Sequence, residues 1–177
     1  GVDRTARFIQ RASQLQTQEQ VSYGITTEGK ITEHCTINTE TLQLSPKIMS
    51  RCHFQQGDAT NLFDYLTGFN LILAANLIDR LTKPKEFLES IHLRLKENGL
   101  LVLASPYTWL EEFTDPKDWL GGYRKNGEVI KTFDTIATIL SKEFSLVKKP
   151  FHIPFVIRET QHKFQHSLSE VSIWKKK

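Results

Sequence analysis

The sequence has few cysteines, no long apolar run and little excess charge. Two cysteines in 177 residues cannot form a disulfide-rich scaffold, and without a secretory signal we expect a reducing, cytoplasmic setting. The longest uninterrupted apolar runs, residues 71–75 and 100–104, are far shorter than the ~18–20 residues of a membrane span. The 23 Lys and Arg against 20 Asp and Glu give a net charge of +3, which is no nucleic-acid footprint. We therefore expect a soluble protein with neither a membrane nor a nucleic-acid partner.

What is present is the composition of a folded domain. Hydrophobic residues make up 39% and charged residues 24% of the chain, which excludes disordered and low-complexity classes. A length of 177 residues is enough for one domain with a real core and too short for two of ordinary size. The sequence predicts a single domain over residues 1–177.

Buried strands and amphipathic helices alternate along the chain. Helices are predicted at residues 8–15, from Pro84 to a left-handed cap at Asn98, and at 133–140. Strands are predicted at 53–56, at 70–75 (covered on both faces), and at 100–104 and 144–147, with a hairpin or loose excursion within 21–50 and a terminal hairpin of 153–158 and 165–174. This alternation predicts an α/β fold, a doubly wound sheet with right-handed crossovers.

The first residues have the pattern of an interrupted unit. Gly1, Val2 and Asp3 have the pattern of the last step of a buried strand, and an amphipathic helix follows at once. No strand sequence comes before them. We therefore expect the chain to be the C-terminal portion of a larger domain.

Polar residues follow several predicted strands, where ligands bind in sheets of this kind. Asp3 suits a ribose, because one carboxylate accepts from two vicinal hydroxyls, and it equally suits a helix N-cap. Asp58 suits an exocyclic amine such as that of adenine, and it equally suits a turn before Asn61. Together the two acids could address the two ends of one adenosine.

Two further segments allow a functional and a structural interpretation. Tyr107 and Trp109 follow the strand at 100–104 and could enclose a cation or a planar ring, or simply pack on the end of the sheet. Asp79 and Arg80 are interpreted first as a surface pair or helix start and only second as catalytic.

These features resemble the class I methyltransferases, which use S-adenosylmethionine. More narrowly, the sequence is similar to the methyltransferases of ovothiol biosynthesis, which N-methylate the imidazole of 5-thiohistidine. The resemblance is carried by residues 2–10, 56–62, 71–81, 101–114, 119–122 and 154–160. The most specific stretches are SPYTWLEEFT at 105–114 and FVIRET at 155–160.

The resemblance implies a Rossmann-like methyltransferase sheet that ends in an antiparallel hairpin. Such a fold normally begins with a strand, a Gly-rich turn and a helix, and the sequence lacks all three. Residues 1–177 would then be the C-terminal portion of a single class I methyltransferase domain. In many members an iron-dependent 5-histidylcysteine sulfoxide synthase precedes this domain, so a fused or cooperating synthase is the expected partner.

The resemblance also implies roles for individual residues. The cofactor-binding residues would be Asp3 and Arg4 at the ribose, Asp58 and Ala59 at the adenine, and Ala75 and Asn76 at the methionyl end. An amino-acid substrate would need a clamp for its carboxylate, and Arg158 is the candidate because a guanidinium binds a carboxylate bidentately; the alternative is a pair of Arg158 with Glu159 or a charge at the sheet edge. Glu112 could receive the ammonium, beside the aromatic residues Tyr107 and Trp109. A neutral imidazole nitrogen is already nucleophilic, so no residue is assigned as a catalytic base.

Parts of the sequence also suit other functions. The adjacent pairs at 34–35 and 52–53 lack the spacing of a structural zinc site, so no metal is expected. A nicotinamide-dependent dehydrogenase would use an acid such as Asp3 equally well. A methyltransferase for another small molecule and a degenerate, non-catalytic cofactor-binding module remain open.

Overall fold

A computed structural model describes all 177 residues, which form two compact units. The first comprises Gly1–Asn61 with Val156–His166, and the second comprises Leu62–Phe155 with Ser167–Lys177. The longest helix, α1, has 13 residues. Across the chain, no helix has both the length and the apolar character needed to cross a membrane.

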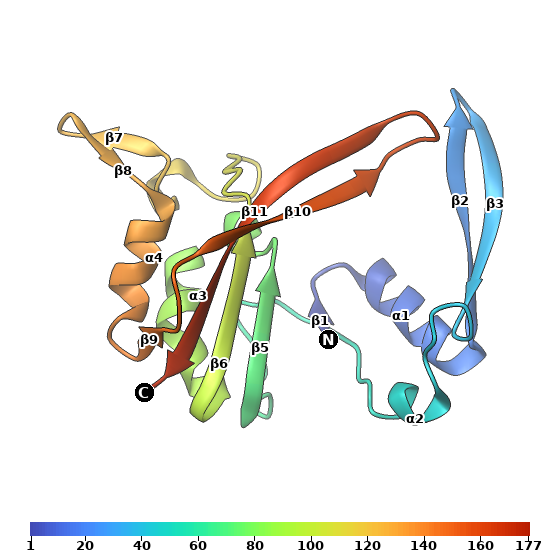
Figure 1. Ribbon diagram of the computed structural model, residues 1–177, viewed down its shortest axis with the longest axis horizontal. Helices are drawn as coiled ribbons and strands as arrows, with labels where there is room; N and C mark the ends of the chain where they lie inside the picture. Colours follow the sequence, from blue (N-terminus) through green and yellow to red (C-terminus); the bar gives the residue numbers. More distant parts are fainter. The chain divides into compact units, whose positions relative to one another are not determined.

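The first unit is built on a short parallel strand pair (Figure 1). Strand β1 (Val2–Asp3) pairs with β4 (Gln55–Gln56), and helix α1 (Ala6–Gln18) directly follows β1. Strands β2 (Gln20–Glu28) and β3 (Ile31–Asn38) form an antiparallel hairpin that turns at Gly29, where φ is +53°, and a short helix α2 (Pro46–Met49) leads on to β4. The predicted first helix and hairpin are confirmed.

The second unit contains a mixed sheet with the strand order β10-β11-β6-β5. Strand β5 (Phe69–Ala75) runs parallel to β6 (Leu95–Ser105), and β11 (Phe164–Lys176) runs antiparallel to β6. Strand β10 (Phe151–Arg158) completes the predicted terminal hairpin, and β9 (Phe144–Leu146) pairs with the end of β11. Since Ala75 lies opposite Ala104 and Glu170 lies opposite Ser105, β5, β6 and the first half of β11 meet at one end of the sheet.

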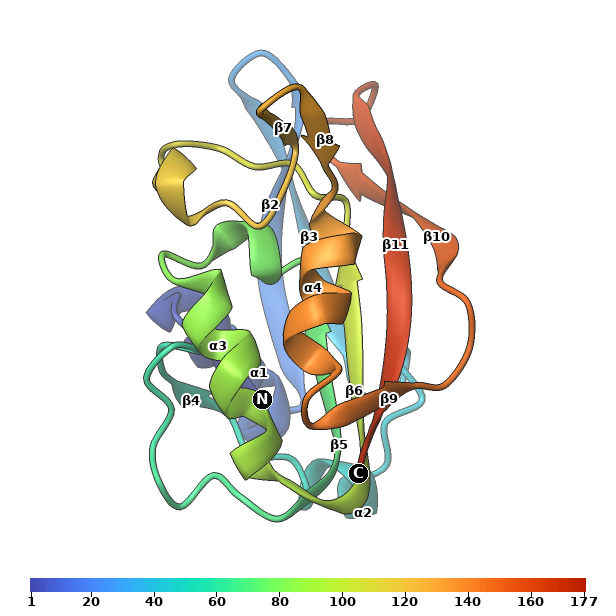
Figure 2. The same cartoon turned by 90° about the vertical axis from the view of Figure 1, so that its left-hand side faces the viewer.

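Helices α3 (Pro84–Ser90) and α4 (Thr132–Leu140) cover one face of this sheet (Figures 1 and 2). The apolar residues that the helical period placed on one side of α3 are buried, and the 3-10 turn η2 (Ile91–Arg94) continues that side. Leu101 of β6 and Ile136 of α4 are at most 1% exposed. The core of the second unit therefore lies between β5, β6 and β11 and these two helices.

Shorter elements connect the sheet and the helices. A 3-10 turn η1 (Ile78–Arg80) follows β5, and a second, η3 (Pro116–Asp118), lies in the long segment after β6. Strands β7 (Tyr123–Lys125) and β8 (Glu128–Ile130) form a small hairpin before α4.

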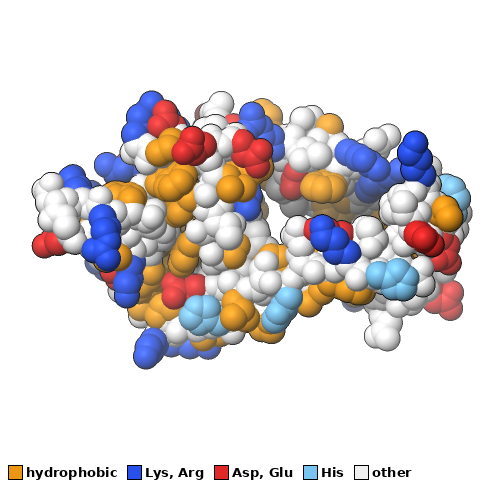
Figure 3. Space-filling model, turned by 90° about the horizontal axis from the view of Figure 1, so that it is seen from above, with side chains coloured by type: hydrophobic (Ala, Val, Ile, Leu, Met, Phe, Trp, Pro, Cys, Tyr) orange, Lys and Arg blue, Asp and Glu red, His pale blue; other side chains and the backbone are white.

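The opposite face of the sheet corrects one prediction, because β5 is not covered on both faces. Ile72 is half-buried and Ala74 is buried, whereas Leu71 and Leu73 are 54% and 62% exposed. The reason is that both helices of the second unit lie on the same side and β5 is an edge strand. Figure 3 shows hydrophobic side chains at the surface among charged residues of both signs.

The position of Asn98 corrects a second prediction. Asn98 has the left-handed backbone expected of it, with φ of 62°, but the helical segment already ends at Arg94. Asn98 instead lies inside β6, where the pairing register shifts between Phe69 and Leu71 of β5. The left-handed residue therefore accommodates a strand irregularity and does not cap a helix.

Candidate functional site

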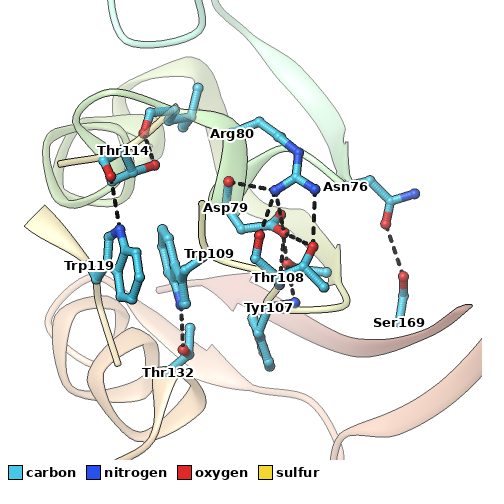
Figure 4. Close-up of polar contacts among 12 residues, drawn as sticks. Asn76, Asp79, Arg80, Tyr107, Thr108, Trp109, Thr114, Trp119, Thr132 and Ser169 are labelled. Carbon is cyan, nitrogen blue, oxygen red and sulfur yellow. Dashed lines mark hydrogen bonds and ion pairs between the residues drawn. The ribbon is translucent and has the colours of Figure 1, made fainter. Parts of the chain in front are cut away.

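Asn76 stands at the carboxyl end of β5 in a left-handed conformation, with φ of 50°. Its backbone N–H donates to the Ala104 carbonyl at 2.7 Å, and its side-chain Oδ1 accepts a hydrogen bond from Ser169 Oγ at 2.9 Å (Figure 4). Ser169 is buried, so the amide is held in one orientation. This leaves the exposed Nδ2 group of Asn76 able to donate to a ligand.

A buried carboxylate, Asp79, organises the loops beside Asn76. Asp79 is 1% exposed; its Oδ1 accepts from Ser105 Oγ at 3.0 Å, and its Oδ2 accepts from the backbone N–H and the hydroxyl of Thr108 at 3.0 and 2.9 Å (Figure 4). Asp79 thus joins the end of β5 to the end of β6. Its burial shows that the interpretation as a surface pair was wrong, whereas the alternative of a helix start is confirmed, because Asp79 lies in the 3-10 turn η1.

Arg80 neutralises this buried charge. Its Nη1 lies 3.0 Å from Asp79 Oδ2 and also donates to the Thr108 carbonyl at 2.7 Å. The guanidinium carbon lies 4.9 Å from the centroid of the Phe113 ring, a cation–π contact. Asp79 and Arg80 therefore form a closed structural unit.

Tyr107 is held by this network in a strained backbone conformation. Its φ is 53°, which is uncommon for a residue with a bulky side chain, and its N–H donates to Ser105 Oγ at 3.1 Å. Its hydroxyl donates to Glu170 Oε1 at 2.9 Å. Burial, followed by the charge of Glu170, raises the pKa of the Tyr107 phenol well above its ordinary value.

Trp109 lies in a packed aromatic cluster. It is 9% exposed, its ring stacks on Trp119 with a centroid distance of 6.2 Å, and its indole N–H donates to Thr132 Oγ1 at 3.0 Å. Trp119 in turn donates to the Thr114 carbonyl at 2.8 Å (Figure 4). The indole N–H of Trp109 is therefore bonded to Thr132, whereas the Tyr107 hydroxyl is bonded to Glu170 of β11.

In the first unit, Asp3 lies at the end of β1, and the N-cap of α1 is Thr5, so the interpretation of Asp3 as the N-cap was wrong. The Oδ1 atom of Asp3 accepts from the Thr5 backbone N–H at 2.7 Å in the turn before the helix, and Oδ2 has no hydrogen bond. The Asp3 carbonyl accepts from the Gly57 N–H at 3.0 Å, which joins the turns that follow β1 and β4. Arg4 is exposed, and its carbonyl accepts from Gln56 Nε2 at 3.0 Å.

Asp58 lies in the turn after β4 and is constrained in the same way. Its Oδ1 accepts from the backbone N–H and the hydroxyl of Thr60, at 2.9 and 2.7 Å, across the half-buried Ala59. These hydrogen bonds, the hydroxyl first, lower the pKa of Asp58, and the charge of Arg4 adds to the effect. Asp58 is thus an ionised carboxylate near neutral pH, and its Oδ2 also remains available.

Each of these two adjacent strand ends has a carboxylate oxygen that could accept a hydrogen bond from a ligand. Each carboxylate has one oxygen fixed by its own backbone turn and one oxygen without a hydrogen bond. A ribose offers hydroxyl donors and an adenine offers an amine donor, which are the partners that ionised carboxylates require. The structure therefore brings Asp3, Arg4, Asp58 and Ala59 together within the first unit.

The remaining predicted residues are more exposed. Ala75 lies beside Asn76 at the end of β5, and Glu112 lies on the exposed segment after β6. Arg158 ends β10 in the first unit, where its Nε donates to the Thr160 carbonyl at 3.2 Å. Its neighbour Glu159 is paired with Lys163 at 2.5 Å and with Gln165, so the alternative pairing of Arg158 with Glu159 does not form.

Sequence analysis missed Ser169 and Glu170, which reach the end of the sheet from β11. The only local signal is a pair of polar residues within an otherwise alternating strand. Their partners Asn76 and Tyr107 are 93 and 63 positions away in the chain, so only the register of β11 on β6 reveals them. No group of three or more His, Cys, Asp or Glu side chains is placed to hold a metal ion.

Comparison with protein families gives one match that covers most of the chain. A family model described as a methyltransferase domain matches residues 8–168. This match agrees with the α/β Rossmann-like architecture described above. No curated protein matches the chain.

Solved structures give matches at low sequence identity. The YcgJ protein of Bacillus subtilis is 13% identical, with a TM-score of 0.53, over 100% of this chain and 81% of that one. The PH0226 protein of Pyrococcus horikoshii OT3 is 12% identical, also with a TM-score of 0.53, over 100% of this chain and 70% of that one. These two likenesses support the fold.

A third match is an N-methyltransferase by name. NodS of Bradyrhizobium japonicum WM9, in complex with S-adenosyl-L-homocysteine, is 16% identical with a TM-score of 0.43. The match covers 77% of this chain and 59% of the NodS chain, so this chain spans less than two thirds of that protein.

Proposed function

The chain belongs to the methyltransferase domain family, whose model matches residues 8–168. We propose that it is an S-adenosylmethionine-dependent N-methyltransferase, or part of one, and that it acts on the imidazole nitrogen of 5-thiohistidine. The family match supports the enzyme class and the cofactor. It also favours methyl transfer over the nicotinamide-dependent alternative. The thiohistidine acceptor rests on the sequence resemblance at residues 105–114 and 155–160.

The observation that carries the proposal is the paired availability of Asp3 Oδ2 and Asp58 Oδ2 at adjacent strand ends. Each side chain is already held in place by the hydrogen bonds to its Oδ1 atom. Ligand binding would therefore cost little side-chain conformational entropy. In this proposal Asp3 accepts from the ribose hydroxyls and Asp58 accepts from the adenine amine.

Methyl transfer depends on the positioning of the two reactants more than on proton transfer by the protein. S-adenosylmethionine, when bound, supplies a methyl group on a sulfonium centre. A neutral imidazole nitrogen attacks without a base, so the residues of the chain contribute orientation and exclusion of water. Arg158 has its Nη groups free to bind the acceptor carboxylate in a bidentate manner.

The first test is calorimetric titration of the full chain with S-adenosylhomocysteine. We expect Asp3→Asn and Asp58→Asn each to weaken binding about tenfold or more, since a hydrogen bond to an ionised acceptor is lost while the Oδ1 contact is kept. Glu33→Gln, an exposed carboxylate on β3, is the matched control and should leave the affinity unchanged. Unchanged affinity in both aspartate variants would remove these residues from the cofactor site.

The second test addresses the acceptor. Methyl transfer from labelled S-adenosylmethionine should be detected with 5-thiohistidine, and Arg158→Met should raise the KM for thiohistidine more than the KM for the cofactor. A selective effect on the cofactor would contradict the carboxylate clamp. Transfer to other small molecules but not to thiohistidine would keep the enzyme class and replace the substrate.

The partner and the compartment belong to the same proposal. A thiohistidine acceptor requires a preceding reaction that forms the carbon–sulfur bond, which an iron-dependent sulfoxide synthase domain would supply. Both cysteines, Cys35 and Cys52, are free thiols in the structure, which is compatible with a reducing cytoplasm.

A further inference from the structure

Glu170 is the carboxylate at the end of the sheet that lacks a positive partner. It is half-buried at the start of the β11–β6 pairing, opposite Ser105, and no Lys, Arg or His lies within ion-pair distance of it. Its one hydrogen bond is the donation from the Tyr107 hydroxyl to Oε1 at 2.9 Å. Oε2 accepts no hydrogen bond in the structure.

The neighbouring carboxylate, Asp79, has a cationic partner and several hydrogen-bond donors. Asp79 is saturated by Ser105, Thr108 and Arg80, so its charge is neutralised within the protein. Partly buried charges are ordinarily paired, because removing an ion from water is costly. An uncompensated carboxylate beside a satisfied one therefore points to a partner from outside the chain.

The backbone at Tyr107 supports the same conclusion. A left-handed φ costs free energy for a bulky residue, and the hydrogen bonds from Tyr107 N to Ser105 and from Thr108 to Asp79 hold it in place. In this backbone conformation the Tyr107 hydroxyl reaches Glu170, and its hydrogen bond to Oε1 holds the carboxylate in one orientation. Such strain is typically found where a binding group is held ready for a ligand.

From this juxtaposition we propose that Glu170, oriented by Tyr107, binds a cationic nitrogen of the methyl acceptor, and that the acceptor is therefore a compound with a protonated amine. The inference rests on the proposed function and deepens it, because it names the charge of the substrate and the residue that selects it. Glu170 Oε2 accepts from the ammonium N–H, and Oε1 keeps the Tyr107 hydrogen bond. Glu170 then replaces Glu112 as the binding residue for the ammonium of an amino-acid acceptor.

The test compares two small probes that differ only in charge. Histamine carries an imidazole and an ammonium, and imidazole-4-ethanol carries the same ring and a neutral hydroxyl. At pH 8.5 the imidazole of both probes is neutral. We expect the full wild-type chain to bind histamine about tenfold or more tightly than imidazole-4-ethanol in calorimetric titration, as a charge-assisted hydrogen bond requires.

Variants then assign that preference to Glu170. Glu170→Gln keeps the acceptor for Tyr107 but removes the charge, so the preference for histamine should be lost. Tyr107→Phe keeps the charge and should retain most of the preference. Glu128→Gln, an exposed carboxylate on β8, is the matched control and should bind both probes like the wild type.

Two results would overturn the inference: a wild-type chain that binds both probes equally, or a Glu170→Gln variant that keeps the histamine preference. If Glu170→Gln does not fold, as judged by circular dichroism, NMR of the wild-type chain decides. Histamine should then shift the Glu170 carboxyl carbon and the Tyr107 ring signals, and shifts confined to other carboxylates would refute the assignment.

Titration with S-adenosylhomocysteine separates this inference from the proposed function. Wild-type chain that binds S-adenosylhomocysteine but shows no histamine preference contradicts only the role of Glu170. A histamine preference that depends on Glu170, without S-adenosylhomocysteine binding, supports the amine site and contradicts the cofactor assignment.

Discussion

Asp79 shows how much one buried side chain contributes at the end of the sheet. It lies in η1 and accepts hydrogen bonds from Ser105 at the end of β6, from Thr108 beyond that strand, and from Arg80. A buried carboxylate with this many donors is a structural centre, since loss of its charge leaves Arg80 unpaired in a partly buried place.

Asp79→Asn should therefore lower the free energy of unfolding by about 3 kcal/mol, because it removes the charge that several buried donors and the partly buried Arg80 contact. Urea denaturation followed by tryptophan fluorescence measures this change. Asp118→Asn, which removes only a surface pair with Lys83, should cost no more than about 1 kcal/mol. Equal losses in the two variants would contradict the central role of Asp79.

The Asp58 turn gives a prediction about pH. Its pKa in the folded chain is lowered, chiefly by the Thr60 hydroxyl, below the value of about 3.9 expected in the unfolded chain. The ionised group therefore stabilises the folded state above about pH 4, and this contribution is lost as the pH falls through the folded pKa. Thr60→Val keeps the backbone hydrogen bond and should raise the pKa of Asp58 toward its ordinary value, as seen by NMR titration of the carboxyl carbon.

Thr138→Val is the control for the Asp58 titration, because the Thr138 hydroxyl bonds to a backbone carbonyl in α4. It should leave the pKa of Asp58 where it is. If Thr60→Val also leaves that pKa unchanged, the hydroxyl does not set the charge state of this turn.

At the scale of elements, local periodicity predicted the helices well. Phe87, Leu88 and Ile91 follow the helical repeat, and all are 2% exposed, although the helical segment ends at Arg94 and not at Asn98. The ends of the strands were also predictable, because Asp3, Asp58 and Asn76 directly follow apolar or extended segments. The helix faces and the strand ends depend on residues that are close together in the sequence, so a local sequence pattern is enough to predict them.

Other features depend on residues far apart in the chain. The apolar run of β5 indicated burial, but it could not show that both helices cover the same face and leave Leu73 exposed. The Glu170 contact to Tyr107 requires the antiparallel register of β11 on β6, which no local pattern fixes. The polar residues of β11 were missed for this reason.

The irregular start of β6 provides a prediction at this scale. Asn98→Ala should lower the free energy of unfolding by about 1 kcal/mol, because alanine tolerates the left-handed conformation poorly. Asn98→Gly should stay within about 0.5 kcal/mol of the wild type in the same urea denaturation experiment. A harmless alanine would show that the backbone relaxes out of the left-handed region.

For the whole molecule, the exposed apolar face of β5 should be detectable in solution. Leu71 and Leu73 lie on it, and contiguous apolar surface binds hydrophobic dyes. We expect the wild-type chain to enhance ANS fluorescence, and Leu73→Lys to reduce the enhancement by about half. Leu93→Lys replaces an equally exposed leucine of η2 and should have little effect; equal reductions would show that the dye does not report on β5.

The division of the chain into two units affects the order in which it folds during synthesis. The first unit combines Gly1–Asn61 with Val156–His166, and the Gln161 N–H donates to the Thr26 carbonyl at 3.1 Å to join the two segments. At the ordinary rate of about 5 to 20 residues per second, the ribosome needs roughly 5 to 20 s to make the intervening stretch. Through that interval the early segment lacks its late partner, so we expect the first unit to stay incomplete until residues 156–166 are made, although its synthesis begins first.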